Sequence, residues 1–150
     1  MDKINPSEYE VYDAKAKVAG RLASTVAKRL MLGKKVAVVN ADDSILSGHK
    51  KDIMAKYKTR LNLQEKENPE HSPYWSRRPD LLFRRIVRGM LPYHRKSTGK
   101  DAYHRLVVFR GIPEELKSVK PIEVESKNPK AIYAGSMKLS ELSKLLGYSR

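Results

Sequence analysis

The sequence predicts one α/β domain built on parallel strands. Residues 36–39 and 106–109 are apolar at every position, which is typical of strands covered on both faces of a parallel sheet. The first of these runs follows a strand-like and then a helix-like segment, which is the order of a βαβ unit. A chain of 150 residues without an internal repeat fits a single domain with its own core.

The βαβ unit occupies the first part of the chain. Residues 9–12 have strand composition, and the crossover from them to residues 36–39 should be right-handed. A helix is predicted over residues 21–32, where apolar side chains recur every four residues, and Gly33 supplies its C-terminal stop. The apolar positions of this helix are Leu22, Val26 and Leu30.

A second helix is predicted over residues 50–63, after a turn at 40–43 and a short extended piece at 44–47 that Gly48 ends. Its buried stripe is Ile53, Tyr57 and Leu61. The loop that follows, residues 64–75, is long for a compact domain, and loops of this length are often functional.

A third helix begins at Pro79, which suits the first helical position because it has no N–H to leave unpaired. Asp80 complements the helix dipole, Gly89 should stop the helix, and Pro92 prevents its resumption. One face is apolar, with Leu82, Phe83, Ile86 and Val87. The other carries Arg84, Arg85 and Arg88, so the helix has a side that anchors it and a side that presents guanidinium groups.

The rest of the chain is predicted to alternate turns with short elements. Residues 93–96 and the surroundings of Gly99 form basic turns, and Arg105 precedes the strand at 106–109. Further predictions are a helical turn within 114–120, an edge strand at 121–125, irregular chain over 126–135, and a helix from Leu139 that Gly147 stops. Residues 1–8 and 148–150 are expected to be loose termini.

Composition indicates a polyanionic partner. The net charge is +14, and residues 71–110 hold ten Lys or Arg against two Asp, whereas residues 1–14 are acidic. Nucleic acid is the leading partner, ahead of an anionic membrane or a basic surface that is merely solvated. No apolar run is long enough for a membrane span, and the polar N-terminus does not resemble a signal peptide. The absence of cysteine excludes disulfides and thiolate chemistry and fits an intracellular site.

The candidate RNA-binding side chains lie in three places. Arginine suits this role because its planar fork can hold a phosphate and stack on a base. Trp75 lies beside the arginines, where it either stacks on a base or packs as a small satellite core. The candidates are Lys50, Lys51, Lys56, Lys58 and Arg60 on the second helix, Trp75 in the loop, and Arg77, Arg78, Arg84, Arg85, Arg88, Tyr93, His94, Arg95, Lys96, Lys100 and Arg105 in the basic segment.

Four blocks of sequence resemble one known family. DAKAKVAGRLAS at 13–24, VVNADDSILSG at 38–48, RRPDLLFRRIVRGMLPY at 77–93 and GKDAYHRLVVFRGIP at 99–113 are similar to large-subunit ribosomal protein family thirteen. The similarity runs through most of residues 9–147. The Gly-rich HTGYPGG segment of bacterial members is absent, and the resemblance is closest to the archaeal form.

The resemblance implies a three-layer α/β/α fold around a mostly parallel sheet of about four strands. It also implies a structural protein of the cytoplasmic ribosome that binds large-subunit rRNA, contacts neighbouring large-subunit proteins and supports subunit assembly. No catalytic residue, cofactor, metal, membrane or small-molecule substrate is expected. The family pattern adds Arg21, in its Gly-Arg pair, to the RNA-binding candidates.

Two other classes of function stay open. Asp13, Asn40, Asp42 and Asp43 would follow parallel strands, where nucleotide-dependent enzymes bind ligands, although neither a GxGxxG nor a GxxxxGK[ST] motif is present. The simpler interpretation is that these side chains bond to nearby backbone in turns. An RNA-binding regulator acting away from the ribosome would use the same basic surface. The four histidines lack the close spacing of a metal site.

Overall fold

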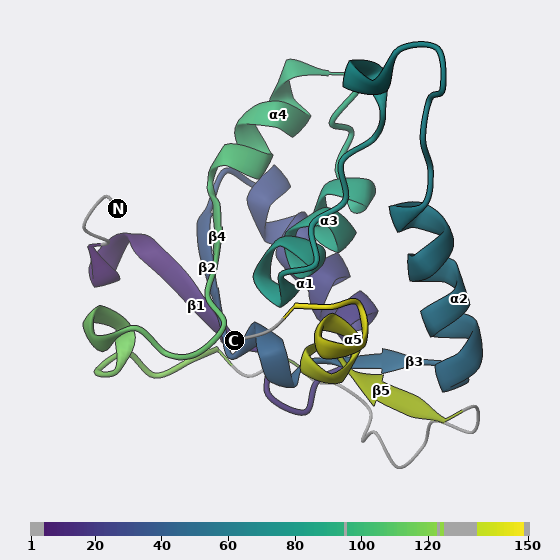
Figure 1. The fold of residues 1–150 in the computed structure, drawn as a ribbon. Helices are drawn as coiled ribbons and strands as arrows, with labels where there is room; N and C mark the ends of the chain where they lie inside the picture. The colour runs from purple at the N-terminus through teal and green to yellow at the C-terminus, as the bar shows by residue number, and fades with distance from the viewer. Residues whose placement is uncertain (1–4, 95, 123, 125–134, 149–150) are drawn as a thin grey trace.

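The computed structural model describes residues 5–94, 96–122, 124 and 135–148, and it confirms the α/β class (Figure 1). A parallel sheet has the strand order β1-β2-β4, with β1 (Tyr9–Asp13), β2 (Lys35–Val39) and β4 (Leu106–Val108). A parallel bridge between Tyr12 and Ile122 extends the sheet beyond β1. In the described ranges the sheet therefore has three full strands and one bridged residue, where about four strands were expected.

The remaining elements surround this sheet. The α-helices of the described chain are α1 (Ala19–Met31), α2 (Lys50–Leu61), α3 (Pro79–Met90), α4 (Ser97–His104) and α5 (Leu139–Leu145). A small antiparallel sheet joins β3 (Ile45–Ser47) to β5 (Ser136–Lys138), a strand that sequence patterning did not reveal. Short 3-10 helices are η1 (Pro6–Glu8), η2 (Ala41–Asp43), η3 (Pro69–His71) and η4 (Glu114–Leu116). No helix among the described residues has both the length and the apolar character to cross a bilayer.

The two faces of the parallel sheet are covered differently. On one face α1 packs against β2, α3 and α4, and the main core lies between these helices and the side chains of Tyr12, Val36 and Val38 (Figure 1). On the other face Leu116 of η4 covers Val11, with Ala37 and Val39 in the same cluster. Apolar residues on both sides of β2 thus follow from burial of both faces, as its sequence predicts.

The observed ends of the helices test the glycine and proline stop signals that the sequence predicts. Gly33 follows α1 at φ +86°, a conformation that glycine adopts without strain, so the predicted stop is confirmed. Gly147 does the same after α5. Gly89, in contrast, lies inside α3, and the helix ends only at Met90. The reason is Pro92, which disfavours the helical conformation at the residue before it, so Leu91 is extended.

The prediction of a basic turn around Gly99 is wrong, because this residue lies within α4. Gly99 is buried where α4 passes close to the chain after α3. A Cβ at this position would lie 2.5 Å from the carbonyl carbon and oxygen of Pro92 and 2.9 Å from the Tyr93 nitrogen. The glycine therefore serves close backbone packing rather than a turn.

Replacing Gly99 by alanine should destabilise the fold by about 1–3 kcal/mol, because backbone atoms of Pro92 must move to admit the methyl group. The control is Gly89→Ala, since a Cβ at Gly89 in α3 meets nothing within 4 Å. That change should stabilise by up to about 1 kcal/mol through helix propensity. Urea unfolding of the two variants measures both, and equal effects on the free energy of unfolding would refute the packing argument.

Helix α2 stands at the margin of the molecule, beside the β3-β5 sheet (Figure 1). It buries only Ile53 and Tyr57, and the predicted stripe residue Leu61 is half-buried. The long loop 64–75 carries η3 and returns the chain to α3. The predicted closing helix is confirmed as α5. The edge strand expected at 121–125 falls partly, and the irregular chain of 126–135 almost wholly, outside the described residues.

Candidate nucleic-acid interface

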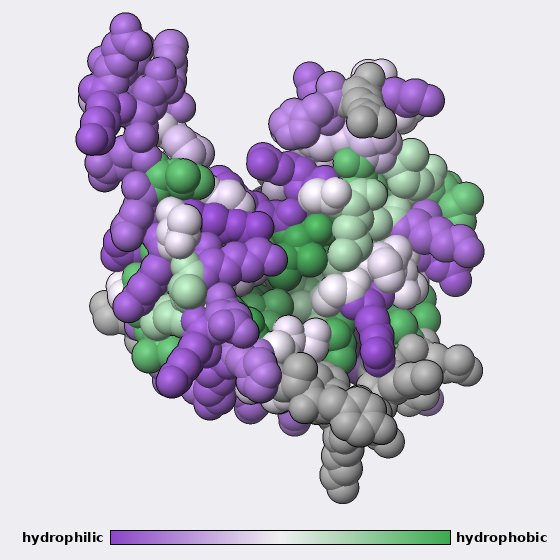
Figure 2. Space-filling model, turned by 90° about the vertical axis from the view of Figure 1, so that its right-hand side faces the viewer, coloured by the Kyte–Doolittle hydropathy of each residue, from purple (hydrophilic) through white to green (hydrophobic). Residues whose placement is uncertain are grey.

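A groove of about 560 Å³ opens between α2 and α3. In the view of Figure 2 this side of the molecule is hollowed, with a hydrophobic floor and hydrophilic margins. The floor includes Val18, Leu46 and Leu82, of which Val18 and Leu82 are buried. The groove brings together six of the predicted RNA-binding side chains, which are Lys56, Arg60, Trp75, Arg85, Arg88 and His94.

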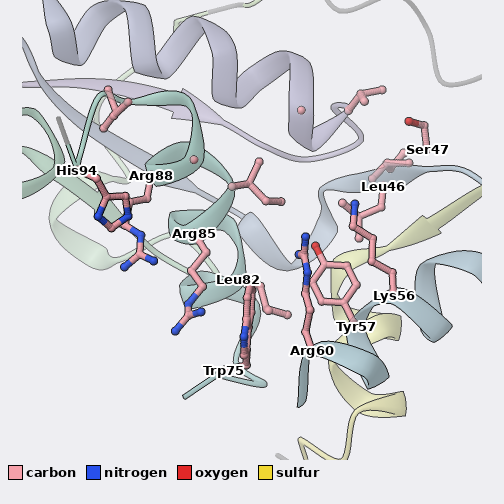
Figure 3. A pocket seen from close by; sticks show the side chains of 16 residues that line it. Leu46, Ser47, Lys56, Tyr57, Arg60, Trp75, Leu82, Arg85, Arg88 and His94 are labelled. Atoms are coloured by element: carbon pink, nitrogen blue, oxygen red, sulfur yellow. The ribbon is translucent and has the colours of Figure 1, made fainter. Parts of the chain in front are cut away.

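Two helices supply the opposite margins of the groove. Arg85 and Arg88 come from α3, whereas Lys56 and Arg60 come from α2, and Trp75 lies between Arg85 and Arg60 (Figure 3). The α3 arginines reach the groove because the opposite face of that helix, with Phe83 and Val87, is buried in the core. The amphipathic pattern of α3 therefore determines which way its guanidinium groups point.

Trp75 stacks with two arginines. The Cζ atoms of Arg60 and Arg85 lie 4.8 Å and 4.2 Å from the ring centroid, which is cation–π geometry. Arg85 also donates a hydrogen bond from Nη2 to the Tyr74 carbonyl oxygen and so ties the loop to α3. The indole is half-buried, and its Nε1 has no hydrogen-bond partner among the described residues. Neither interpretation of Trp75 from sequence included this arginine–tryptophan–arginine arrangement.

The groove is electropositive. Four Lys or Arg side chains line it, and the lining residues in the described chain include no carboxylate. Burial lowers the pKa of the Arg85 guanidinium, and the charges of Arg88 and Arg60 lower it further. These like charges disfavour one another in the free protein, so a bound anion would relieve their repulsion.

A second aromatic cluster supports the arginines on α3. Arg88 Cζ lies 5.2 Å from the Tyr93 ring centroid, and Arg84 Cζ lies 4.9 Å from that of Tyr103. The Tyr93 ring in turn contacts the rings of His94 and Tyr103 edge to face, at 5.2 Å and 5.4 Å between centroids. Tyr93 is thus a support for Arg88, a role that its position in a basic turn did not reveal.

Three predicted RNA-binding cations that do not line the groove have hydrogen-bond or ion-pair partners within the chain. Arg78 donates to Asp80 through Nε at 3.2 Å and Nη2 at 2.6 Å, and this carboxylate raises the pKa of the guanidinium. Arg105 donates from Nη2 to the Leu30 carbonyl oxygen at 2.9 Å, near the end of α1. Lys50 pairs with Glu141 at 2.8 Å. These contacts give each cation a structural role, and contact of any of them with RNA stays a prediction.

The other candidates that the structure describes do not line the groove. Arg77 is exposed beside α5, where its backbone oxygen accepts a hydrogen bond from Ser143 at 2.6 Å. Arg21, Lys51, Lys58, Lys96 and Lys100 are exposed. Arg95 lies outside the described residues.

The sequence interpretation missed Tyr57 as a groove residue, because its place in the apolar stripe of α2 predicted only burial. Its ring is buried and also lies 5.4 Å from Arg60 Cζ. The signal that was available is the spacing, since residues three apart on a helix share a face. Gly89 also lines the groove. The sequence pattern predicts only a helix stop at this glycine and gives no sign of this second role.

Three of the polar residues after the strands, Asp13, Asn40 and Asp43, have hydrogen-bond or ion-pair partners within the described chain. Asn40, in the left-handed conformation at φ +55°, donates from Nδ2 to Asp13 Oδ1 at 2.9 Å, and the backbone N–H of Lys15 donates to the same oxygen. Asp43 pairs with Lys138 at 3.0 Å. Only the bond from Lys15 to Asp13 is the contact with nearby backbone that the simpler interpretation expects, because the other two join side chains that lie 27 and 95 residues apart in the chain. No group of three or more metal-binding side chains occurs among the residues that the structure describes.

Asp42 differs, because its Oδ1 is buried without a hydrogen-bond partner in the described chain. Burial raises the pKa of this carboxyl, against the opposing charge of Arg110. The folded state therefore binds the proton more tightly than the unfolded chain. The resulting contribution to stability is present below the unfolded pKa of about 4 and is lost as the pH rises through the folded pKa.

Asp42→Asn should therefore make the protein more stable than wild type at neutral pH, with the difference shrinking toward pH 4. Urea unfolding across this pH range measures it. The control is Asp43→Asn, which removes the exposed pair with Lys138 and should change stability by no more than about 1 kcal/mol. A neutral-pH loss of stability in Asp42→Asn would contradict the prediction.

Comparison with known proteins gives one consistent family. The family model for ribosomal protein L13 matches residues 7–115. The large ribosomal subunit protein uL13 of Methanosphaera stadtmanae is 49% identical over 138 residues, covering 91% of this chain and 96% of the relative. The proteins of the same name from Methanopyrus kandleri and Archaeoglobus fulgidus are each 38% identical over 148 residues, covering 97% and 94% of this chain and 91% and 89% of the relatives.

Proposed function

This chain belongs to the ribosomal protein L13 family, and from that membership we propose that it is a structural constituent of the large ribosomal subunit. It binds large-subunit rRNA, contacts neighbouring large-subunit proteins and supports assembly of the subunit in the cytoplasm. The three relatives named above are archaeal, and each matches more than nine-tenths of the chain.

The main observation behind the proposed RNA-binding surface is the groove between α2 and α3, which four cations line without an acidic side chain among the described lining residues. Such a surface gains free energy when phosphate groups displace counterions, and that gain falls steeply with salt. The exposed side chains of Arg21, Lys51, Lys58, Lys96 and Lys100 are available to bind further phosphates. The RNA-binding site proposed here is the groove together with these flanking residues.

We propose a structural rather than catalytic role. Family membership supports this, and so does the hydrogen bond between Asp13 and Asn40, since the polar side chains at the ends of these neighbouring strands already have partners within the chain. Thermal unfolding in the presence of ATP, GTP, NAD and Mg²⁺ tests the enzyme alternative. A saturable rise in Tm that depends on Asp13 would favour a nucleotide-binding enzyme, because a ligand that binds only the folded state stabilises it.

Crosslinking locates the RNA-binding surface directly. Purified protein bound to large-subunit rRNA is irradiated and digested, and the crosslinked peptides are identified by mass spectrometry. The proposal expects crosslinks in residues 50–60 and 75–94. Crosslinks confined to η4 or the end of α1 would place the RNA on another face and overturn the proposed surface, and co-sedimentation with large subunits at raised salt separates a ribosomal role from an extra-ribosomal one.

A further inference from the structure

The groove is built for more than a phosphate. A phosphate needs only cations and N–H donors, yet the floor of the groove is apolar, with Val18, Leu46 and Leu82 at the base and Leu91 nearby. Figure 2 shows this hydrophobic floor sunk between hydrophilic margins. A ligand that matches the whole groove therefore has an apolar, flat part as well as a charged part.

The size of the groove distinguishes two forms of RNA. Its volume of about 560 Å³ lies in the range of sites that enclose most of a small molecule. A regular duplex keeps its bases stacked and presents sugars and phosphates, so it cannot place a base in such a hollow. An unpaired nucleotide can leave the stack and bring a base and a phosphate together.

The margins of the groove offer surfaces for a base. The Arg60 guanidinium lies over the rings of both Tyr57 and Trp75, which hold it in place, and bases in RNA complexes stack on guanidinium planes as well as on aromatic rings. Arg85 and Arg88 lie on the α3 side of the groove, with Trp75 between Arg85 and Arg60 (Figure 3). The Nε1 of Trp75 is a buried donor without a partner in the described residues.

We infer that the groove between α2 and α3 takes a single unpaired nucleotide extruded from the RNA. The base lies over the apolar floor against Arg60, and its phosphate lies toward Arg85 and Arg88. The inference rests on the proposed function and deepens it, because it names the form of RNA that this site selects. The rest of the basic surface then binds backbone phosphates without regard to pairing.

The test uses two hairpin RNAs with the same paired stem. One of them carries a single extra, unpaired adenosine in the stem, and 2-aminopurine takes the place of this adenosine as a fluorescent probe. Gly89→Phe fills the groove without changing charge, because Gly89 lines it and a Cβ there meets nothing within 4 Å. Gly89→Leu is the second filling variant. Gly111→Phe adds the same ring outside the groove, at a position where a Cβ is equally free.

Wild type and Gly111→Phe should bind the bulged hairpin about tenfold more tightly than the paired one, with a change in 2-aminopurine emission as the base stacks. Gly89→Phe and Gly89→Leu should lose the preference and the fluorescence change while keeping the salt dependence of binding. Circular dichroism confirms that the variants fold.

Each other outcome is informative. Steep, salt-dependent binding without a preference for the bulge, or a preference that survives in Gly89→Phe and Gly89→Leu, overturns the nucleotide site and leaves the proposed RNA surface in place. Failure to bind either hairpin or large-subunit rRNA overturns both.

Discussion

Replacing Arg60, Arg85 and Arg88 together by glutamine is expected to lower the affinity for large-subunit rRNA about a hundredfold or more at moderate salt. The three side chains face one groove without an acidic neighbour among the described lining residues. Each charge-assisted contact to phosphate contributes about 1.5–3 kcal/mol, and the effects are not fully additive. The slope of log affinity against log salt should fall by up to about three, because three fewer phosphates are neutralised.

The control for this variant removes the same charge elsewhere. Lys28, Lys34 and Lys120 are exposed and do not line the groove, so their replacement by glutamine should leave the affinity nearly unchanged. Filter binding or anisotropy over a salt series measures both variants. If the two triple variants lose affinity equally, the protein binds RNA through net charge alone and the groove has no special role.

The groove variant also changes the free protein in two opposing ways. The variant removes the repulsion that Arg60 and Arg88 exert on the partly buried charge of Arg85, which favours the folded state. It also loses the stacking of Arg60 and Arg85 on Trp75, and each of these contacts is worth about 0.5–1 kcal/mol. Glutamine keeps part of the aliphatic stem and can still donate a hydrogen bond. Stability should therefore change little, and the affinity loss reports on the RNA contact.

The second large effect is expected in the core beneath these arginines. Phe83 lies on the buried face of α3 and is fully inaccessible to solvent. Phe83→Ala should destabilise the protein by about 3–5 kcal/mol, through lost apolar burial and the cavity left behind. That is a large fraction of the 5–15 kcal/mol that is typical of a natural domain, so partial unfolding at physiological temperature is expected.

Met90→Ala at the end of the same helix is the matched control, since Met90 is half-exposed and the change should stay within about 0.5 kcal/mol. Urea unfolding gives both values. RNA binding by the folded fraction of Phe83→Ala should keep its salt slope, because the arginines are unchanged. A small loss of stability in Phe83→Ala would mean that α3 is not anchored as the structure indicates.

The sequence by itself determined the α/β class, the positions of α1, β2 and α3, and the division of α3 into an apolar and a guanidinium face. These features depend on local patterns: periodicities of 2 and 3.6 residues, a Pro at the first helical position, and a Gly after the last turn. The family was also recognisable from short blocks of residues in the right order, and the comparisons confirm it.

One further contact could have been read locally. Arg78 and Asp80 are two residues apart at the start of α3, and a first-turn carboxylate next to an arginine is a natural pair. The partners of Arg105 and Lys50, in contrast, are Leu30 and Glu141, which lie 75 and 91 residues away in the chain. Local patterns carry no information about such contacts, so these two cations could not be told apart from exposed ones.

Only the tertiary structure decided which basic side chains share a site. The groove joins residues 56–60 of α2 to residues 85–94 across the long loop, with Trp75 placed between two arginines. The tertiary structure also shows that Gly99, inside α4, permits close packing of that helix against the backbone of Pro92. The physical reason is the same in each case. Helix and strand propensities depend on a few neighbouring residues, whereas the contact between two distant segments depends on how whole helices and strands pack around the core.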